Sequence, residues 1–162
     1  MGVGTATIAT AGVTATLVFG LQTLEGVVFR GPTAVPPQSS ARRSVWDGVF
    51  TEPQAARGAE SYQYSCATCH SPDLEGDAGR DIPALYGDQF VRGWNRRTIK
   101  DLFDLINKAM PKDSPGSLKA ETYADIVAFV LQANEFPAGA QELPVDVAAL
   151  ERIGIDAAPP IR

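Results

Sequence analysis

Apolar residues in this chain recur mainly at the three- and four-residue spacing of α-helices. The first clear segment follows Thr51, a favourable N-cap residue, with Pro53 in the first turn, where its missing N–H costs little. Its positions at helical spacing are Ala55, Gly58, Ala59, Tyr62 and Cys66. The pattern therefore predicts a helix that runs up to Cys66, with Gln54 at an exposed position.

Two further helices are predicted nearer the C-terminus. Thr98 and Asp101 form a capping-box pair, and Pro111 biases Met110 away from helical geometry, so this helix should end there. The last helix should span about 120–133. Its apolar stripe is Tyr123, Ile126, Val127, Val130 and Leu131. No segment in which apolar and polar residues alternate is long enough to indicate a β-sheet, so we predict an all-α fold.

The N-terminal residues differ from the rest of the chain. Residues 2–24 carry no charged side chain, which suits the core of an export signal or a thin membrane anchor. The first positive residues, Arg30, Arg42 and Arg43, follow this run, which reverses the charge pattern expected of an anchor for an external domain. A cleaved signal, a retained anchor at residues 2–24 and an ordinary packed helix all stay open for 1–29.

The remaining boundaries follow from composition. Residues 30–45 have the Pro and Ser content of an extended linker. We predict a globular domain at 46–139 and a C-terminal tail at 140–162, with a short helix at 147–153. The net charge of −5, from 14 basic and 19 acidic residues without a long single-sign run, argues against a nucleic-acid partner.

The strongest chemical signal is the sequence Cys66-Ala67-Thr68-Cys69-His70, because C-x-x-C-H is the attachment signature of a c-type haem. The two thiols can bond to the two vinyl groups of one haem, while His70 offers an imidazole to the iron. The sequence therefore predicts one haem c, held covalently through Cys66 and Cys69. Such attachment in bacteria is completed outside the inner membrane, so we expect a periplasmic protein, either soluble or anchored to the outer side of that membrane.

The two cysteines allow two other interpretations. A thiol–disulfide exchange site usually lies near a βαβ pattern, whereas the flanks here are predicted to be helical. A structural zinc site usually needs four Cys or His ligands, and this chain has only Cys66, Cys69 and His70. Both alternatives are weaker than haem attachment.

The chain resembles the class I cytochromes c, and the similarity covers residues 45–139. In that family a glycine precedes the first haem cysteine by eight residues with an aromatic midway, as Gly58, Tyr62 and Cys66 do here. The resemblance implies a class I cytochrome c fold in which the first and last helices cross at Gly58, against Ile126 and Phe129. Segments 45–58, 94–110 and 123–129 are similar to the small cytochrome domains associated with pyrroloquinoline-quinone alcohol dehydrogenases.

The sixth iron ligand follows almost by elimination. A second histidine is lacking, and Met110 is the only methionine besides Met1. Met110 also precedes a Pro-containing turn, where class I cytochromes place their axial methionine. A core methionine that continues the helix stripe is the plainer alternative, but the haem motif favours ligation.

The resemblance also implies several residues around the haem. Pro83 corresponds to the proline whose carbonyl accepts a hydrogen bond from the ligating imidazole, and Leu85 should pack on the porphyrin. Trp94 and Arg97, with Arg92 and Arg96 nearby, could supply donors for the haem propionates, although the arginines could equally form a solvated face. We expect the acidic side chains between Asp73 and Asp81 to be solvated.

These features imply a one-electron carrier or electron-transfer subunit with His/Met ligation, not an enzyme. Its partners would be redox proteins, such as a dehydrogenase, an oxidase, or a photosynthetic or respiratory complex. If Met110 were a labile ligand, a haem-based small-ligand sensor or a weak peroxidase would be the alternative.

Overall fold

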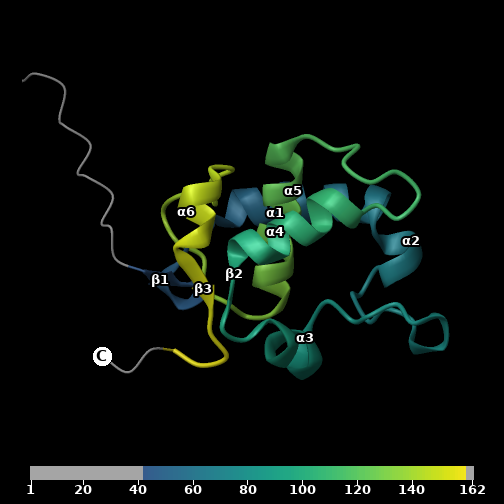
Figure 1. Cartoon of the computed structure of the whole chain (residues 1–162), viewed down its shortest axis with the longest axis horizontal. Coiled ribbons are helices and arrows are strands. Elements are labelled where there is room, and N and C mark those ends of the chain that lie inside the picture. The colour runs from purple at the N-terminus through teal and green to yellow at the C-terminus, as the bar shows by residue number, and fades with distance from the viewer. Residues whose placement is uncertain (1–41, 160–162) are drawn as a thin grey trace, which may run out of the picture. The chain divides into compact units, whose positions relative to one another are not determined.

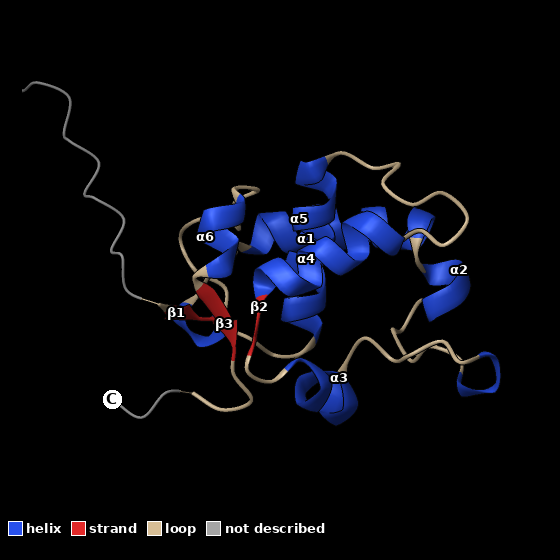
Figure 2. Ribbon diagram, viewed as in Figure 1, coloured by secondary structure: helices blue, strands red, loops and turns tan. Residues whose placement is uncertain are grey.

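A computed structural model describes residues 42–159, and Figures 1 and 2 show the arrangement of their elements. The predictions for residues 1–29 and for residues 30–41 of the linker lie outside the described residues. The helices of the described part are α1 (Glu52–Ser65), α2 (Ala67–His70), α3 (Gly87–Trp94), α4 (Ile99–Ala109), α5 (Ala120–Ala133) and α6 (Val147–Glu151). Among these residues, no helix has both the length and the apolar character needed to cross a membrane.

Two short 3-10 helices and three short strands complete the described part. They are η1 (Val45–Asp47), η2 (Ala78–Arg80), β1 (Arg43–Ser44), β2 (Arg97–Thr98) and β3 (Ile153–Ile155). The core is helical, which confirms the all-α prediction.

Helices α1 and α5 cross in direct contact at Gly58. A Cβ built at this glycine would overlap the carbonyl oxygen of Asp125, so any larger residue must push the two backbones apart. One turn further along α1, the ring of Tyr62 lies 5.2 Å from that of Phe129 on α5. The crossing therefore lies where the resemblance to the class I cytochromes c implied it.

The predicted helix boundaries are also found in the structure. Thr51 Oγ1 accepts a hydrogen bond from the Gln54 N–H at 3.2 Å and caps α1. Thr98 and Asp101 form a reciprocal capping box on α4, and Met110 is the C-cap of that helix. Because these signals are local, the sequence alone predicts them well.

Helix α3 was not predicted. Its eight residues contain one buried residue, Phe90, and no side chain caps its N-terminus. A helix of about two turns offers too few apolar positions for a clear periodic signal.

The prediction of a separate C-terminal tail after residue 139 is corrected by the packing of residues 140–155. Leu143, Leu150, Ile153 and Ile155 are all buried in the main hydrophobic core. Strand β3 pairs in parallel with β1 and antiparallel with β2, so the strand order is β1-β3-β2. Strands of two or three residues that pair across long stretches of chain leave no alternating pattern to detect.

The same sheet corrects the linker prediction at its C-terminal end. Ser44 and Val45 are buried, and the backbone N–H of Arg43 donates to the carbonyl of Arg152 at 2.8 Å. The indole N–H of Trp46 donates to the carbonyl of Asp156 at 2.8 Å. The packed unit thus begins no later than residue 43, and both of its described ends lie in one small sheet.

Gln54 is buried rather than exposed, which corrects the sequence expectation. Only 2% of the residue is accessible, and its amide pairs with the backbone of Leu143. Nε2 donates to the Leu143 carbonyl at 3.0 Å, and Oε1 accepts from the Leu143 N–H at 2.6 Å. The Gln54 side chain therefore pairs with the backbone of the C-terminal segment, as the backbone of a neighbouring strand would.

Candidate haem-binding site

The two cysteines and the histidine lie on a single helical turn. Cys66 is the C-cap of α1, and its N–H donates to the Tyr62 carbonyl at 2.8 Å. The chain then re-enters a helix, α2, in which the N–H groups of Cys69 and His70 donate to the Cys66 carbonyl at 3.1 and 2.9 Å. Residues three apart on a helical turn are neighbours, so both thiols are placed to reach one cofactor.

His70 is oriented by a backbone carbonyl. Its imidazole is buried, and Nδ1 lies 3.1 Å from the carbonyl oxygen of Pro83. Since a carbonyl can only accept, the contact assigns the proton to Nδ1. Nε2 is then the unprotonated nitrogen that can bind a metal, and within residues 42–159 it makes no hydrogen bond.

The loop between His70 and Pro83 is held in place by backbone contacts. Gly76 donates its N–H to the His70 carbonyl at 2.9 Å and has a φ of +68°. A Cβ at Gly76 would lie 2.6 Å from the Pro83 carbonyl oxygen. The positive φ of Gly76 and the lack of room for a Cβ both favour glycine at this position. The close approach lets the Pro83 carbonyl reach the His70 imidazole.

Asn134 links the end of α5 to the segment that follows Pro83. Its Nδ2 donates to the carbonyls of Leu85 and Val130 at 2.9 and 2.8 Å, and its Oδ1 accepts from the Gly87 N–H at 2.9 Å. Sequence reasoning missed this residue. The only available signal was a polar side chain just after the apolar stripe of the last helix, which is equally typical of a solvated helix end.

Met110 lies at the end of α4 in extended conformation, with φ −129° and ψ 152°. Its N–H donates to the Ile106 carbonyl at 3.0 Å, and its carbonyl accepts from the hydroxyl of Tyr123 at 2.8 Å. The residue is partly buried. Its backbone is thus fixed from both α4 and α5.

The structure brings Trp94 and Arg97 together but leaves the other arginines apart. The guanidinium carbon of Arg97 lies 5.0 Å from the Trp94 ring centroid, a cation–π arrangement. Arg92 instead pairs with Asp88 at 3.2 Å on the surface, and Arg96 is exposed. Leu85 is partly buried against the hydrophobic core.

The environment of Cys66 does not suit disulfide exchange. Burial, with a smaller contribution from Cys69, raises the pKa of Cys66 to about 11. Exchange chemistry needs a thiolate, and this thiol stays protonated at neutral pH. Within residues 42–159, no group of three or more His, Cys, Asp or Glu side chains is placed to hold a metal ion, so the zinc alternative has no ligand set there.

The donor set fits a c-type haem. Two free thiols lie on one turn, an imidazole presents Nε2, and a thioether lies on a separate element. Hard oxygen ligands are not part of this set, whereas imidazole and thioether suit haem iron.

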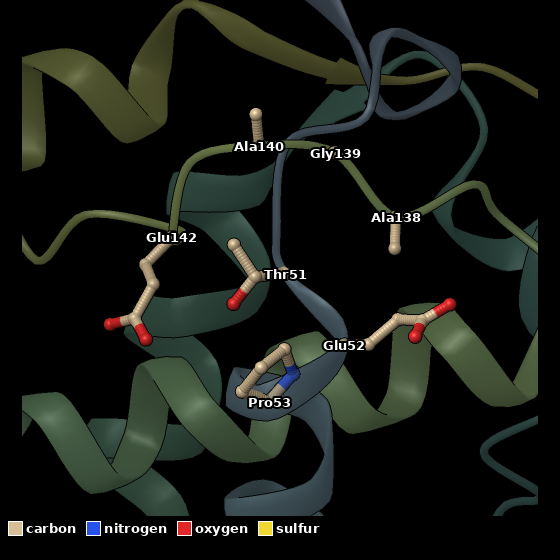
Figure 3. A pocket seen from close by; sticks show the side chains of 7 residues that line it. All are labelled: Thr51, Glu52, Pro53, Ala138, Gly139, Ala140 and Glu142. Carbon is tan, nitrogen blue, oxygen red and sulfur yellow. The ribbon is translucent and has the colours of Figure 1, made fainter.

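An open surface pocket lies elsewhere. Its lining consists of Thr51, Glu52, Pro53, Ala138, Gly139, Ala140 and Glu142 (Figure 3). The N-terminal end of α1 forms one side of it, about 20 Å from Cys66 by the helical rise per residue. The pocket is therefore not part of the cysteine and histidine site.

A comparison with known protein families gives a match across the cysteine turn. Residues 53–130 match the model of a family described as cytochrome C oxidase, cbb3-type, subunit III. The matched segment runs from the start of α1 through the cysteine turn and Met110 into α5. Residues 53–130 form a class I c-type cytochrome domain. No curated protein and no solved structure matches the chain.

Membership of the cytochrome domain in this class has two direct consequences. A cytochrome c domain implies haem c as the cofactor and electron transfer as its activity. Domains of the matched family work with redox partners. The elements outside the match are β1, η1, α6 and β3, which pack against the domain.

Proposed function

We propose that this protein is a monohaem c-type cytochrome that carries single electrons, with its iron between His70 and Met110. The observation that carries the proposal is the 3.1 Å contact between His70 Nδ1 and the Pro83 carbonyl, next to both cysteines. This contact leaves Nε2 as the iron ligand and raises its basicity. The haem, attached through Cys66 and Cys69, supplies the iron(III)/iron(II) couple.

The Met110 thioether is the proposed second axial ligand. Thioether ligation favours the ferrous state and raises the reduction potential relative to harder ligands. Two protein ligands also keep oxygen and peroxide off the iron, which supports a carrier rather than an enzyme or a gas sensor. Leu85 is proposed to pack on the porphyrin, and Trp94 with Arg97 is proposed to face the propionates.

The proposed partners are redox proteins on the outer side of the inner membrane. The description of the matched family names an oxidase subunit, which supports a terminal oxidase as electron acceptor. The resemblance to cytochromes of quinoprotein alcohol dehydrogenases supports a dehydrogenase as donor. The proposed location is the periplasm, with residues 2–24 serving as export signal or as anchor.

Covalent attachment can be tested by acid–acetone extraction of the purified protein. The pigment should stay with the polypeptide, and intact-mass spectrometry should show the mass of one haem. The double variant Cys66→Ala, Cys69→Ala should release its pigment or contain none. A colourless unmodified polypeptide after extraction would rule out a c-type cytochrome.

Ligation by Met110 can be tested separately with Met110→Ala. This variant should keep its covalent haem but lose the thioether-to-ferric charge-transfer absorption, show a lower reduction potential and bind carbon monoxide when reduced. Leu105→Ala, at an exposed position of the same helix, should change none of these properties. If the unmodified reduced protein already binds carbon monoxide readily, the sensor or peroxidase alternative replaces electron transfer.

A further inference from the structure

The hydroxyl of Tyr123 lies between the two ends of the loop that follows Met110. Its Oη donates to the Met110 carbonyl at 2.8 Å and accepts a longer contact, 3.5 Å, from the Leu118 N–H. The loop from 111 to 117 leaves α4 and returns before α5, so one side chain of α5 contacts both its start and its end.

The Tyr123 ring is itself held firmly. Only 2% of the residue is accessible, and its ring packs edge-to-face on Phe103 of α4 with centroids 6.4 Å apart. A buried tyrosine with a fixed ring has little freedom to move its hydroxyl. The position of the Met110 carbonyl is therefore tied to the packed interface between α4 and α5.

The loop has few other restraints. Residues 112–117 are exposed, and among the described residues the hydrogen bonds of 111–117 stay within the loop. These are Ser114 N–H to the Pro111 carbonyl at 3.0 Å, Ser117 N–H to the Ser114 carbonyl at 3.3 Å, and two long hydroxyl contacts. Local bonds of this kind shape the loop without fixing it to the helices.

We propose that Tyr123 is a positioning residue that holds the Met110 backbone so that its sulfur stays on the iron. This inference rests on the proposed function, because it needs Met110 as a ligand. A methionine side chain has three rotatable bonds and adapts easily, so its sulfur is placed well only if its backbone is fixed. The Tyr123 hydroxyl supplies that restraint from α5, and the Ile106 carbonyl supplies it from α4.

The test is Tyr123→Phe in the full-length haem-loaded protein. The ferric form is titrated from pH 6 to pH 11 while the thioether charge-transfer absorption is followed. The fraction without the sulfur ligand should rise about fivefold, because the typical net contribution of a hydrogen bond of this kind corresponds to about a factor of five in such an equilibrium. The pH midpoint for loss of the absorption should fall accordingly, and carbon monoxide should bind the ferrous form faster.

Tyr62→Phe is the matched control. Tyr62 is equally buried, and its hydroxyl also donates to a backbone carbonyl, that of Ser71, at 2.7 Å. A merely structural role for Tyr123 would lower the stability of both variants and leave both midpoints alike. Equal midpoints would overturn the inference and leave the proposed function intact. Absence of the absorption from the unmodified protein would overturn Met110 ligation and this inference with it.

Discussion

The two ends of helix α1 are held by different kinds of contact. At the C-terminal end, Cys66 begins the turn that carries Cys69 and His70, the residues of the proposed iron site. At the N-terminal end, Gln54 pairs with the backbone of Leu143, and a Cβ at Gly139 would overlap the carbonyl oxygen of Gly48. This end contains no residue of the proposed iron site.

The difference separates function from stability along one helix. Changes to Cys66, Cys69 or His70 should alter absorption and potential, whereas changes at the N-terminal end should alter the free energy of unfolding alone. Gly58 lies between them, where α1 crosses α5. The following predictions test this division, beginning with the change that should affect the whole helix.

Gly58→Ala should have the largest effect on stability. The added Cβ would overlap backbone atoms of α5, which cannot rotate away as a side chain can. We expect a loss of about 3 kcal/mol or more in the free energy of unfolding, at the upper end of the range for overpacked cores. Denaturant unfolding of the haem-loaded protein measures it.

Gly93→Ala is the matched control for this change. Gly93 is also helical, and a Cβ there would meet open space. Alanine should therefore stabilise α3 slightly, by about 0.5 kcal/mol. Similar effects of the two substitutions would contradict a close crossing at Gly58.

Leu150→Ala should cost about 3 kcal/mol, the usual cost of truncating a buried leucine. Leu150 on α6 is fully buried, although the sequence alone placed it in a tail. Leu105→Ala, at a half-exposed site on α4, should cost far less. Haem absorption should be the same in both variants. A Leu150 variant as stable as the Leu105 variant would show that α6 contributes little to the domain in solution.

The elements that the sequence predicted well all depend on local signals. Thr51 and Thr98 indicate helix starts, and Pro111 indicates a helix end. Gly58, Tyr62 and Cys66 carry the family resemblance that implies the crossing. The motif at 66–70 indicates the haem chemistry through residue identity and spacing alone. In each case the informative residues lie within about a dozen positions of one another, so the pattern can be recognised without knowing the fold.

The elements that the sequence missed all depend on contacts between distant segments. Gln54 is polar and was therefore expected to be exposed, but its amide is satisfied by Leu143, which lies 89 residues away. Strand β3 has only three residues and pairs with β1 from the other end of the domain. The side chains of Asn134 and Tyr123 donate hydrogen bonds to backbone carbonyls. Every residue has such a carbonyl, so the sequence does not indicate which one is the partner.

Gln54→Ala should cost about 2 kcal/mol. It removes two hydrogen bonds and leaves the N–H and carbonyl of buried Leu143 without partners. Gln63→Ala is the control on the same helix, since Gln63 is exposed and makes only a long 3.4 Å contact with the Pro72 carbonyl. The reduction potential should be unchanged in both. A shifted potential in the Gln54 variant would break the proposed division between the two ends of α1.

The smallest effect should come from Asp101, which caps α4 at the end opposite Met110. Hydrogen bonds from the backbone N–H and hydroxyl of Thr98, each 2.9 Å long, hold the pKa of Asp101 below its ordinary value. A carboxyl whose pKa is lowered by folding stabilises the folded state above its unfolded pKa, about 4. That contribution is lost as the pH falls through the lower, folded value.

Asp101→Asn should therefore lower the free energy of unfolding at pH 7 by about 1 kcal/mol, a typical cost for a weakened cap. The gap between variant and unmodified protein should shrink as the pH is lowered from 5 toward 2, since the unmodified carboxyl then becomes protonated too. Glu60→Gln, on the exposed face of α1, should show no comparable gap at either pH. Urea unfolding at pH 7 and pH 2.5 distinguishes these outcomes, and a gap of constant size would mean that the Asp101 charge does not contribute to the cap.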